Sequence, residues 1–557
     1  MNQTRRTDMT VPMQVQLYNG TAEAAYLDAL EIRDAGGELI RRVELGGERL
    51  KGDGGTVFEL YHKMEVVRPE LSHRHQHRLF YPLDERPELG PNTEAELMRE
   101  ILDGVNRLKE SGAPQLRNVV FELPFAQIFP AGSRPGDYGL FDLNLQYRQG
   151  GQGHQVLLSH EIKLLAAHMP PPAAWNQGRA TTGQWYSGDL HVHNCRDQAI
   201  DGCPEECAAE SVNITGSFTN EQLRDQYKAL GFHFFNTSTH SYCINSDSEF
   251  QEVVNEADSL DEADFKVLLG TEVTGRESGV QDGSDLADAL CFLGWGYEVH
   301  HMGAVGIQNR KPGGQDGFLD FCDGPLNSIH ENSIAVNAEG GFAVVNHPDA
   351  DMWAFNSSDT LLGIGSNETW GVEIWNGGGP RANGEHKGWW VRRLLKGRLL
   401  YPFSGSDTHD EAYDFGGNFV YVEGPLSDQA LVDAMKAGRT YLSNGPFLAI
   451  TVKDQSGNRL QMGDIRVVPS GAVPANYPVD VNVFYNTAQP AFIRLYQGRV
   501  GDHDETLVQE FTGLSGEGSV TANLILEDTV SSWYRAELIY DDWNGSAYTT
   551  PVFVVIR

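Results

Sequence analysis

The stretch YSGDLHVH, residues 186–193, is a short strand-like run that ends in two histidines one residue apart. Successive residues of a strand point to opposite faces, so His191 and His193 point to the same face. Further runs of this kind follow, and each carries a His, Asp or Glu at or near its end. These residues are His240, Glu272, His301, His347, Asp407 and His409. A single histidine is more often a surface or core residue, but the repetition in separate segments predicts a shared site.

The region 183–446 alternates short apolar runs with helical patterns. Within 218–231, Thr219 and Gln222 form a capping-box pattern, and Gly231 marks the end of the helix. Continuous apolar strands that alternate with helices favour a parallel α/β sheet or barrel. Barrel enzymes carry their chemistry at the C-terminal ends of the strands, where the candidate residues fall. We therefore expect an α/β fold for this region.

The flanking regions are rich in strand patterns. The segments 141–148 and 479–485 alternate apolar and polar residues, which is typical of half-buried strands. A capping-box pattern at Thr93 and Glu96 indicates one helix, and the prolines at 170–172 favour an extended linker. The expected organisation is an N-terminal mixed, strand-rich domain (1–180), a central domain (183–446) and a C-terminal β-sandwich (447–557).

The chain is strongly acidic. Its 42 basic and 77 acidic side chains give a formal net charge of −35. Nucleic acids and anionic membranes are recognised through basic footprints, so neither is an expected partner. A small anionic substrate stays compatible with this charge, because metal ions and arginines can reverse the potential inside a pocket.

No segment is an obvious membrane anchor or signal peptide. No apolar run approaches the roughly 18 residues that cross a bilayer. The N-terminal stretch 1–14 has two arginines but no apolar run behind them. We expect a cytoplasmic protein by default. A periplasmic or secreted protein is the alternative, because a processed chain would look the same.

Six cysteines in 557 residues do not form a disulfide scaffold. They lie at Cys195, Cys203, Cys207, Cys243, Cys291 and Cys322, so four of them fall close to the first histidine motif. The Cys203–Cys207 pair fits a disulfide, a soft metal pair or two unrelated thiols, and the sequence leaves all three open.

The candidate residues predict a metal centre. Imidazole and carboxylate ligands without a required thiolate suit Zn²⁺, Mn²⁺ or Fe²⁺. The i, i+2 spacing lets Asp407 and His409 reach one ion, as it does for the first histidine pair. A single Glu such as Glu272 has two oxygens and can bridge two ions. Ions about 3.5–4 Å apart would hold a hydroxide and clamp an oxyanion.

Several motifs in order resemble those of a known family. DLHVH (189–193), GTEV (270–273), HMGAVGI (301–307) and GSDTH (405–409) look like the successive motifs of PHP (polymerase and histidinol phosphatase) metallohydrolases, as do TH at 239–240 and NHP at 346–348. The segments 435–447 and 533–540 resemble the carbaryl-hydrolase-type branch. The resemblance covers about 183–557. It implies a distorted (β/α)7 PHP barrel with two or three divalent ions.

The resemblance also implies a ligand set. The first ion would take His191, His193, Glu272 and Asp407, and the second would take Glu272, His301 and His347. A third would take His240 and His409 with one more ligand from the loop after His193. His300 competes with His301, which keeps the family's spacing to Gly306.

The loop after His193 departs from the family pattern. Relatives carry a short HSxxSDG-like segment there, whereas this chain reads HNCRDQAIDGC over 193–203. Asp197, Asp201 or a cysteine are the candidates for the third-ion ligand, so occupancy of the third position is open. Asp189 is expected to orient a ligand histidine.

Four residues are candidate substrate contacts. Asn376 follows a predicted strand, and Arg381 and Lys387 lie on the next segment, where a cation would meet an anionic group. The alternative, held as equal, is a solvated Gly-rich loop with ordinary charges. Arg276, four residues after Glu272, is a further candidate for an oxyanion contact.

The expected function is a metal-dependent phosphoesterase in which a metal-bridging hydroxide attacks a phosphoester. His240 or His409 would protonate the leaving oxygen if either is free of metal. One alternative is hydrolysis of a carbamate or carboxylic ester at the same metals. Another is a non-catalytic binding protein with structural metals. The flanking β-domains would shape the mouth of the site or mediate self-association, which leaves a homo-oligomer open.

Overall fold

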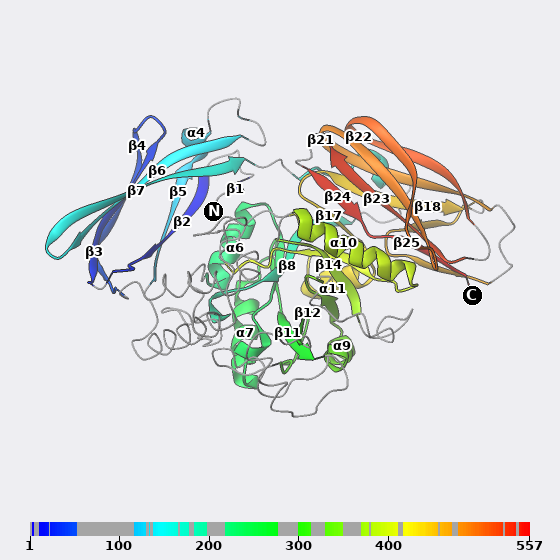
Figure 1. Cartoon of the computed structure of the whole chain (residues 1–557), viewed down its shortest axis with the longest axis horizontal. Coiled ribbons are helices and arrows are strands. Elements are labelled where there is room, and N and C mark those ends of the chain that lie inside the picture. The colour runs from blue at the N-terminus through cyan, green and yellow to red at the C-terminus, as the bar shows by residue number, and fades with distance from the viewer. Residues whose placement is uncertain are drawn as a thin grey trace, which may run out of the picture.

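The computed structural model describes most of the chain, in segments. They are 3–4, 10–21, 23–52, 116–129, 133, 137–164, 168–177, 183–197, 218–276, 299–313, 329–348, 369–377, 380–409, 416–454, 457–469, 477–526, 530–541 and 545–556. In Figure 1 the N-terminal strands lie at one end, the C-terminal strands at the other, and the central helices and strands lie below and between them. The helix expected at Thr93 and Glu96 falls outside the described residues.

The N-terminal part consists of a five-stranded sheet in the order β1-β7-β6-β3-β4 and a two-stranded sheet of β2 and β5. The alternation expected for 141–148 is confirmed, because Phe141 and Leu143 are buried in the core of this part. The elements are β1 (Gln3–Thr4), β2 (Thr10–Tyr18), β3 (Ala25–Asp34), β4 (Leu39–Leu50), β5 (Leu116–Pro124), α4 (Phe125–Ile128), β6 (Tyr138–Gln149) and β7 (Gln152–Leu164).

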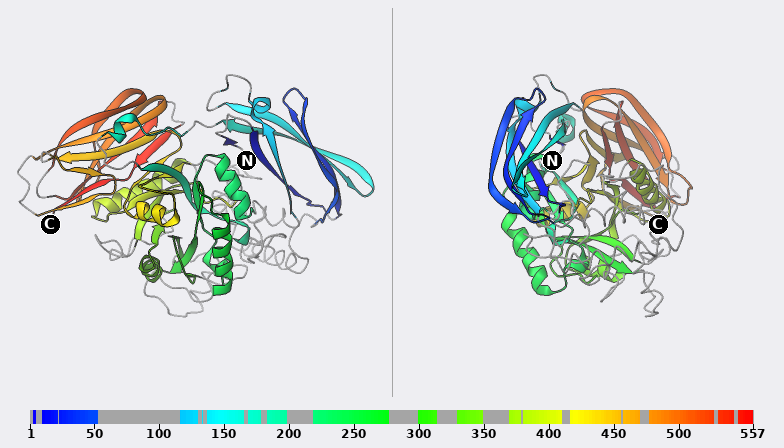
Figure 2. Two further views of the ribbon diagram at one scale, coloured as in Figure 1. Left: turned by 180° about the vertical axis from the view of Figure 1, so that it is seen from behind. Right: turned by 60° about the vertical axis from the view of Figure 1, so that its left-hand side comes forward.

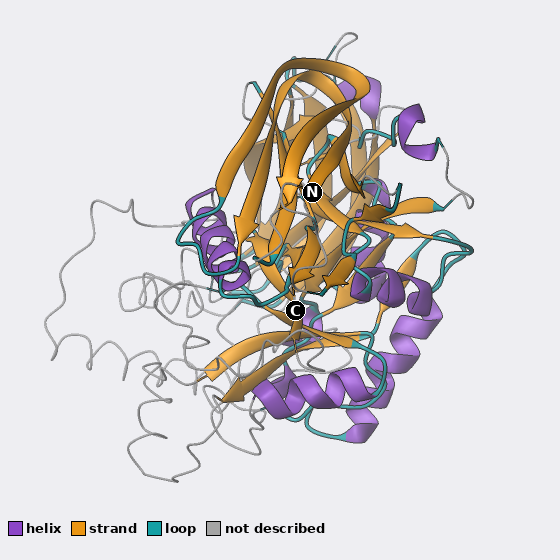
Figure 3. Cartoon of the chain, turned by 90° about the vertical axis from the view of Figure 1, so that its right-hand side faces the viewer, coloured by secondary structure: helices purple, strands orange, loops and turns teal. Residues whose placement is uncertain are grey.

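The central part carries most of the helices (Figure 3). The helix predicted from Thr219 is confirmed as α6, with a complete capping box to Gln222 and with Gly231 at φ 84° just beyond its end. The elements are β8 (Gln184–Val192), α6 (Asn220–Ala229), β9 (Phe234–Thr237), α7 (Asp247–Leu260), β10 (Lys266–Leu268), β11 (Gly270–Arg276), β12 (Val299–Val305), α9 (Ile329–Ala338), β13 (Phe342–Val345), β14 (Thr369–Asn376), α10 (Pro380–Leu395), β15 (Tyr401–Gly405), β16 (Gly417–Val422), α11 (Asp428–Lys436) and β17 (Thr440–Ser443), with the short 3-10 helices η1 (Cys195–Asp197) and η3 (Ser241–Cys243).

The C-terminal part is built from strands that pack around their own core (Figure 2). Its longest pair is β21 and β22, and β21 contains the alternating segment 479–485. The elements are β18 (Phe447–Asp454), β19 (Arg459–Gln461), β20 (Ile465–Val468), β21 (Tyr477–Arg499), β22 (Thr506–Leu526), β23 (Ser532–Tyr540), β24 (Ser546–Thr549) and β25 (Val552–Ile556).

The expected α/β class and its distorted (β/α)7 barrel are wrong. Of the described residues, 53% lie in strands and 19% in helices. The central strands are divided between two sheets, one of five strands in the order β11-β12-β13-β14-β15 and one of 13 strands that continues through β16 and β17 into the C-terminal strands. The pairs β11·β12, β12·β13, β8·β16 and β16·β17 are antiparallel, whereas β8·β9, β9·β10, β13·β14 and β14·β15 are parallel. An apolar run predicts a buried strand but carries no information on the direction of its neighbour, which is why the expectation of a wholly parallel sheet or barrel failed.

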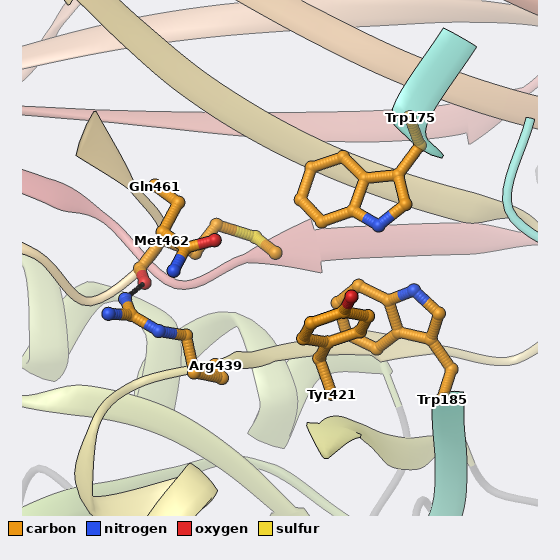
Figure 4. Close-up of a pocket in the computed structure, with 6 residues that line it drawn as sticks. All are labelled: Trp175, Trp185, Tyr421, Arg439, Gln461 and Met462. Atoms are coloured by element: carbon orange, nitrogen blue, oxygen red, sulfur yellow. Dashed lines mark hydrogen bonds between the residues drawn. The ribbon is translucent and has the colours of Figure 1, made fainter. Parts of the chain in front are cut away.

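The linker after the three prolines is anchored by an aromatic cluster. A single helical turn, α5 (Ala173–Asn176), carries Trp175, whose ring lies 5.8 Å from that of Trp185 and 5.4 Å from that of Phe484, centroid to centroid. Figure 4 shows the two indoles with Tyr421 beside them. The linker therefore ties the central sheet to the C-terminal core.

The cap of α6 gives a first test of the fold. Replacing Thr219 with Ala removes the side-chain oxygen that accepts from the Gln222 backbone N–H. We expect the variant to lose about 1 kcal/mol of unfolding free energy, measured by chemical denaturation. Thr219→Ser, which keeps the hydroxyl, serves as control and should stay close to the parent. Equal losses in both variants would contradict the capping role.

Candidate metal centre

The eight predicted ligands converge because two isolated bridges bring the two central sheets together. His240 pairs with Glu272 across one bridge, and Val192 pairs with Thr408 across the other. The first bridge joins the end of β9 to β11, and the second joins the end of β8 to the segment after β15. Residues from six segments therefore meet at one place; Glu272 and His301 lie within β11 and β12, and the others lie at or after the ends of their strands.

Glu272 lies at the middle of the cluster, and five histidines surround its carboxylate. Its Oε1 lies 3.1 Å from His191 Nε2, from His301 Nδ1 and from His347 Nε2. Its Oε2 lies 3.1 Å from His240 Nε2 and 3.5 Å from His193 Nε2. The two oxygens thus face different histidines, as expected of a carboxylate that bridges two ions.

Asp407 and His409 complete the cluster on its partly exposed side. Asp407 Oδ1 lies 3.3 Å from Nε2 of both His191 and His193. The ring of His409 stacks on that of His193, with 3.9 Å between the centroids. The side chains of Asp407, His409 and His301 are 12%, 13% and 18% exposed, whereas Glu272 is 1% exposed. This side is where a small molecule would approach.

The ligand atoms fall into four overlapping groups, each small enough to surround one ion. The groups are His191 with His193 and Asp407, His191 with Glu272 and His347, His240 with Glu272 and His301, and His193 with His240 and His409. The family-based partition assigned each of these histidines to one ion, but in the structure His191, His193 and His240 each belong to two groups. The geometry accommodates two or three ions but does not fix which histidine would bind which ion.

The donor chemistry fits divalent ions. Nε2 of His191 and Nε2 of His193 lie 3.1 Å apart, so two imidazole nitrogens face each other in a buried site. Burial by itself would raise the pKa of Glu272, but His301 and His191 hold that pKa well below its usual range. His191 and His193 act in the same way against burial to keep the pKa of Asp407 low. Both carboxylates are therefore ionised at neutral pH and suited to cations.

Asp197 orients two of the histidines. It lies fully buried in η1, where its Oδ2 lies 2.7 Å from His193 Nδ1 and its Oδ1 accepts a hydrogen bond of 2.8 Å from the His240 backbone N–H. Its contacts place it behind His193, so that Nε2 of this histidine faces the cluster. A carboxylate in this position fixes the tautomer and orientation of a ligand histidine. Of the candidates for a third-ion ligand, Asp197 thus serves the histidines, and Asp201 lies outside the described residues.

Asp189 acts on the backbone. Its Oδ1 accepts hydrogen bonds from the backbone N–H groups of His191 and Ser406, at 2.9 and 3.0 Å. Burial raises the pKa of Asp189 to about 6. The residue expected to orient a ligand histidine thus holds the ends of β8 and β15 beside each other.

Three further polar residues lie in the centre and were not among the eight predicted ligands or the four predicted substrate contacts. Glu373, on β14, lies with Oε1 3.1 Å from His191 Nδ1. Asn346 donates to Glu272 Oε1 at 2.9 Å. The ring of Tyr242 packs against that of His240, with 4.6 Å between centroids. Glu373 had a signal, its place in the strand-like run 371–376, whereas nothing in the sequence separated Asn346 or Tyr242 from ordinary core residues.

Two of the predicted ligands have unusual backbone conformations. His347 has a φ of 25° and Asp407 a φ of 53°, and these are the described non-glycine residues with positive φ. Such conformations cost about 1–3 kcal/mol each and persist where surrounding contacts enforce them. The strain coincides with the two sites at which a strand end must turn its side chain into the cluster.

Of the four predicted substrate contacts, the structure describes the side chains of Asn376 and Lys387. Asn376 donates to Glu373 and to Asp407, so it belongs to the network behind the ligands. Lys387, on α10, forms an ion pair with Glu537 of β23 at 3.1 Å and lies over the ring of Tyr548. Arg276 ends β11 and Arg381 lies in the first turn of α10, but their side chains fall outside the described residues.

Both described cysteines are disulfide-bonded. Cys195 lies in η1 beside Asp197, and Cys243 lies in η3 three residues after His240. Neither is therefore a thiolate ligand in this state. Cys203 and Cys207 lie outside the described residues.

Comparisons with known proteins do not identify a family. No protein-family model matches the sequence, and no curated protein matches it. Solved structures that overlap it in part include a calcium-binding mutant of Bacteroides uniformis beta-glucuronidase 2 (10% identity, TM-score 0.18, 98% of this chain and 59% of that chain) and Parabacteroides merdae beta-glucuronidase (8% identity, TM-score 0.16, 99% and 62%). This chain spans about three fifths of their length, and a similarity this low does not define a shared fold.

Metal binding should release protons. Burial lowers the pKa of His193, but Asp197 and Asp407 raise it to about 10, and the pKa of His191 is also raised well above its ordinary value by Asp407 and Glu272. Both imidazoles must be neutral to bind an ion, so affinity should rise with pH up to about 10, by about tenfold per unit for each proton released. Calorimetric titration with Mn²⁺ at pH 8, in two buffers of different ionisation enthalpy, measures the release. Heats that do not depend on the buffer would contradict it.

Lys387 should affect stability and leave turnover unchanged. Lys387→Met removes the ion pair to Glu537 but keeps the aliphatic stem, so we expect a loss of about 1 kcal/mol or less in unfolding free energy. KM and kcat for any substrate of the centre should stay within twofold of the parent. A KM raised tenfold or more would restore Lys387 as a substrate contact.

Proposed function

We propose that this chain is a metal-dependent hydrolase that cleaves a phosphoester. The observation that supports this proposal is the set of four overlapping ligand groups, two of which share the buried carboxylate of Glu272. Divalent ions held there would lower the pKa of water and polarise the scissile ester. The ordered resemblance of the motifs to PHP metallohydrolases supports the same chemistry.

The net charge of the centre affects whether it attracts an anionic or a neutral substrate. Four carboxylates lie in or behind it: Glu272, Asp407, Asp197 and Glu373. Two divalent ions would balance four negative charges, and a third would leave the centre positive. A positive centre attracts an anionic ester, which is why we prefer a phosphoester when three ions bind.

The residues of the chain supply the remaining roles. His409 is partly exposed beside Asp407, and it could protonate the leaving oxygen of a bound molecule when the His193–His240–His409 group holds no ion. His240 is more deeply buried, with Nε2 directed at Glu272, and it is the second candidate for this proton transfer. Asp407 and Glu272 both lie beside Nε2 of His191, and they would be the carboxylate ligands of the ions.

Hydrolysis of a carbamate or carboxylic ester at the same centre is the second candidate function. In the part of the chain that the structure describes, the side chains of Lys387 and Lys311 are paired with Glu537 and Glu339, away from the cluster. A neutral ester requires no cation beyond the ions themselves, so this arrangement favours it. A non-catalytic role with structural metals is the remaining alternative.

The disulfides bear on the compartment. Disulfides form and persist in oxidising surroundings and are rare in the cytosol. The two disulfide-bonded cysteines therefore favour the periplasmic or secreted alternative over the cytoplasmic one. None of the helices among the described residues is both long and apolar enough to span a bilayer.

Substitution of Glu272 tests the hydrolase. Glu272→Gln keeps the shape of the side chain but removes the charge that faces five histidines, so bound metal should fall and kcat/KM should drop by about 10³-fold or more. Metal content is measured by mass spectrometry on the same sample. Glu510→Gln, the same change on an exposed strand, is the matched control. Full turnover with full metal content in Glu272→Gln would contradict the proposed function.

The substrate class follows from one assay panel on the metal-loaded parent protein. We expect turnover of p-nitrophenyl phosphate or bis-p-nitrophenyl phosphate. Turnover of a naphthyl carbamate alone would favour the second candidate. Inertness towards all three esters with ions bound would favour the non-catalytic alternative.

A further inference from the structure

The carboxylate of Glu373 accepts hydrogen bonds from several parts of the metal centre at once. Its Oε1 lies 3.1 Å from Nδ1 of His191, the histidine of β8. Its Oε2 accepts from the backbone N–H of His347 at 2.8 Å and from Asn376 Nδ2 at 2.9 Å. Asn376 Nδ2 in turn lies 3.3 Å from Asp407 Oδ2. One side chain thus links ligand residues that follow β8, β13 and β15.

The local backbone is shaped for these contacts. Residues three apart on a regular strand point to opposite faces, so Glu373 and Asn376 would not meet. The pairing of β14 with β15 shifts register between Glu373 and Trp375, which adds a residue and turns the following side chains to the other face. The bulge therefore brings Asn376 onto the same face as Glu373.

The neighbouring strand leaves room for the carboxylate. Gly405 ends β15, and a Cβ at this position would lie 1.9 Å from Glu373 Oε1 and 2.3 Å from the Cβ of His191. Only glycine fits between these two side chains. The close approach of Glu373 to His191 therefore depends on features of two adjacent strands.

We propose that Glu373 is a positioning residue for the ions held by His191, His347 and Asp407. All three groups that reach it are donors, and only a carboxylate accepts on both oxygens. By accepting from Nδ1, it fixes the tautomer of His191 in which Nε2 carries a lone pair towards Glu272 and Asp407. By holding the His347 N–H, it stabilises the positive φ at that residue.

Asp197 provides a matched comparison, because it serves the other half of the centre. It contacts His193 Nδ1 and the His240 N–H, whereas Glu373 contacts His191 and His347. Each histidine of the His191–His193 pair thus has its own carboxylate. Both carboxylates serve the His191–His193–Asp407 group, but His191 with His347 and His193 with His240 also belong to groups of their own, so loss of Glu373 and loss of Asp197 should each most weaken a different ion.

The test uses Co²⁺ as the probe ion and compares Glu373→Gln, Glu373→Asp and Asp197→Asn with the parent chain. Calorimetry gives the affinity of each binding step, and the visible absorption of bound Co²⁺ reports its ligands. In Glu373→Gln the amide N–H₂ group replaces one carboxylate oxygen and must face an N–H donor. One step of Co²⁺ binding should therefore weaken by about 10–100-fold. Asp197→Asn should weaken a step with a different absorption spectrum.

Glu373→Asp separates positioning from packing. Asp is shorter but keeps two accepting oxygens, so it should retain tighter Co²⁺ binding than Gln if hydrogen bonding is what matters. If Glu373 only fills space, Gln, with nearly the same shape, should bind better than Asp, and the proposal is overturned. Thermal unfolding of the metal-free variants shows whether each one folds.

The role of Glu373 rests on the proposed metal centre, but different results overturn this role and the proposed function. A parent chain that binds no Co²⁺ overturns the proposed function, and the role of Glu373 with it. If the parent chain binds Co²⁺ and Glu373→Gln binds it with the same affinity, only the role of Glu373 is overturned. Loss of every ion in both Glu373→Gln and Asp197→Asn overturns the division of the centre between the two carboxylates.

Discussion

The centre depends on one buried negative charge. Glu272 lies within 3.5 Å of nitrogens on five histidines that come from strands far apart in the sequence. An unpaired carboxylate at this depth would be strongly destabilising, so the histidines and the ions that they can hold are a condition for burying it. In return, Glu272 provides the common point to which the six segments are directed.

The residues behind the cluster hold the ligand residues in place. Carboxylates behind the cluster take the outward nitrogens of His191 and His193, which leaves the inward nitrogens for ions. Asp189 holds the backbone of the two strand ends together, and the 3-10 turn that carries Asp197 and the one that follows His240 each contain a disulfide-bonded cysteine. Much of the rigidity of the centre therefore comes from groups that contact no ion.

The sequence predicted local features but did not predict the direction in which neighbouring strands pair. The capping box at Thr219 and the alternation at 141–148 were predicted because propensity and periodicity act over a few residues. All eight candidate ligands could be named, since each follows or lies within an apolar run. The direction of neighbouring strands was not predictable from such runs, so the parallel barrel was wrong. The ion pair of Lys387 with Glu537 could not be predicted, because a helical segment shows its charges but not the strand, β23, that pairs with them.

The hydrogen bonds between the central and C-terminal strands have a consequence for how this chain can be divided. β8, which carries His191, pairs with β16, and β16 leads through β17 to β24 near the end of the chain. Exchange of the tail for another module at residue 446 would leave β17 with an open edge two strands from the centre. The central and C-terminal parts therefore share one hydrogen-bonded sheet, and a division of the chain at this point would break it.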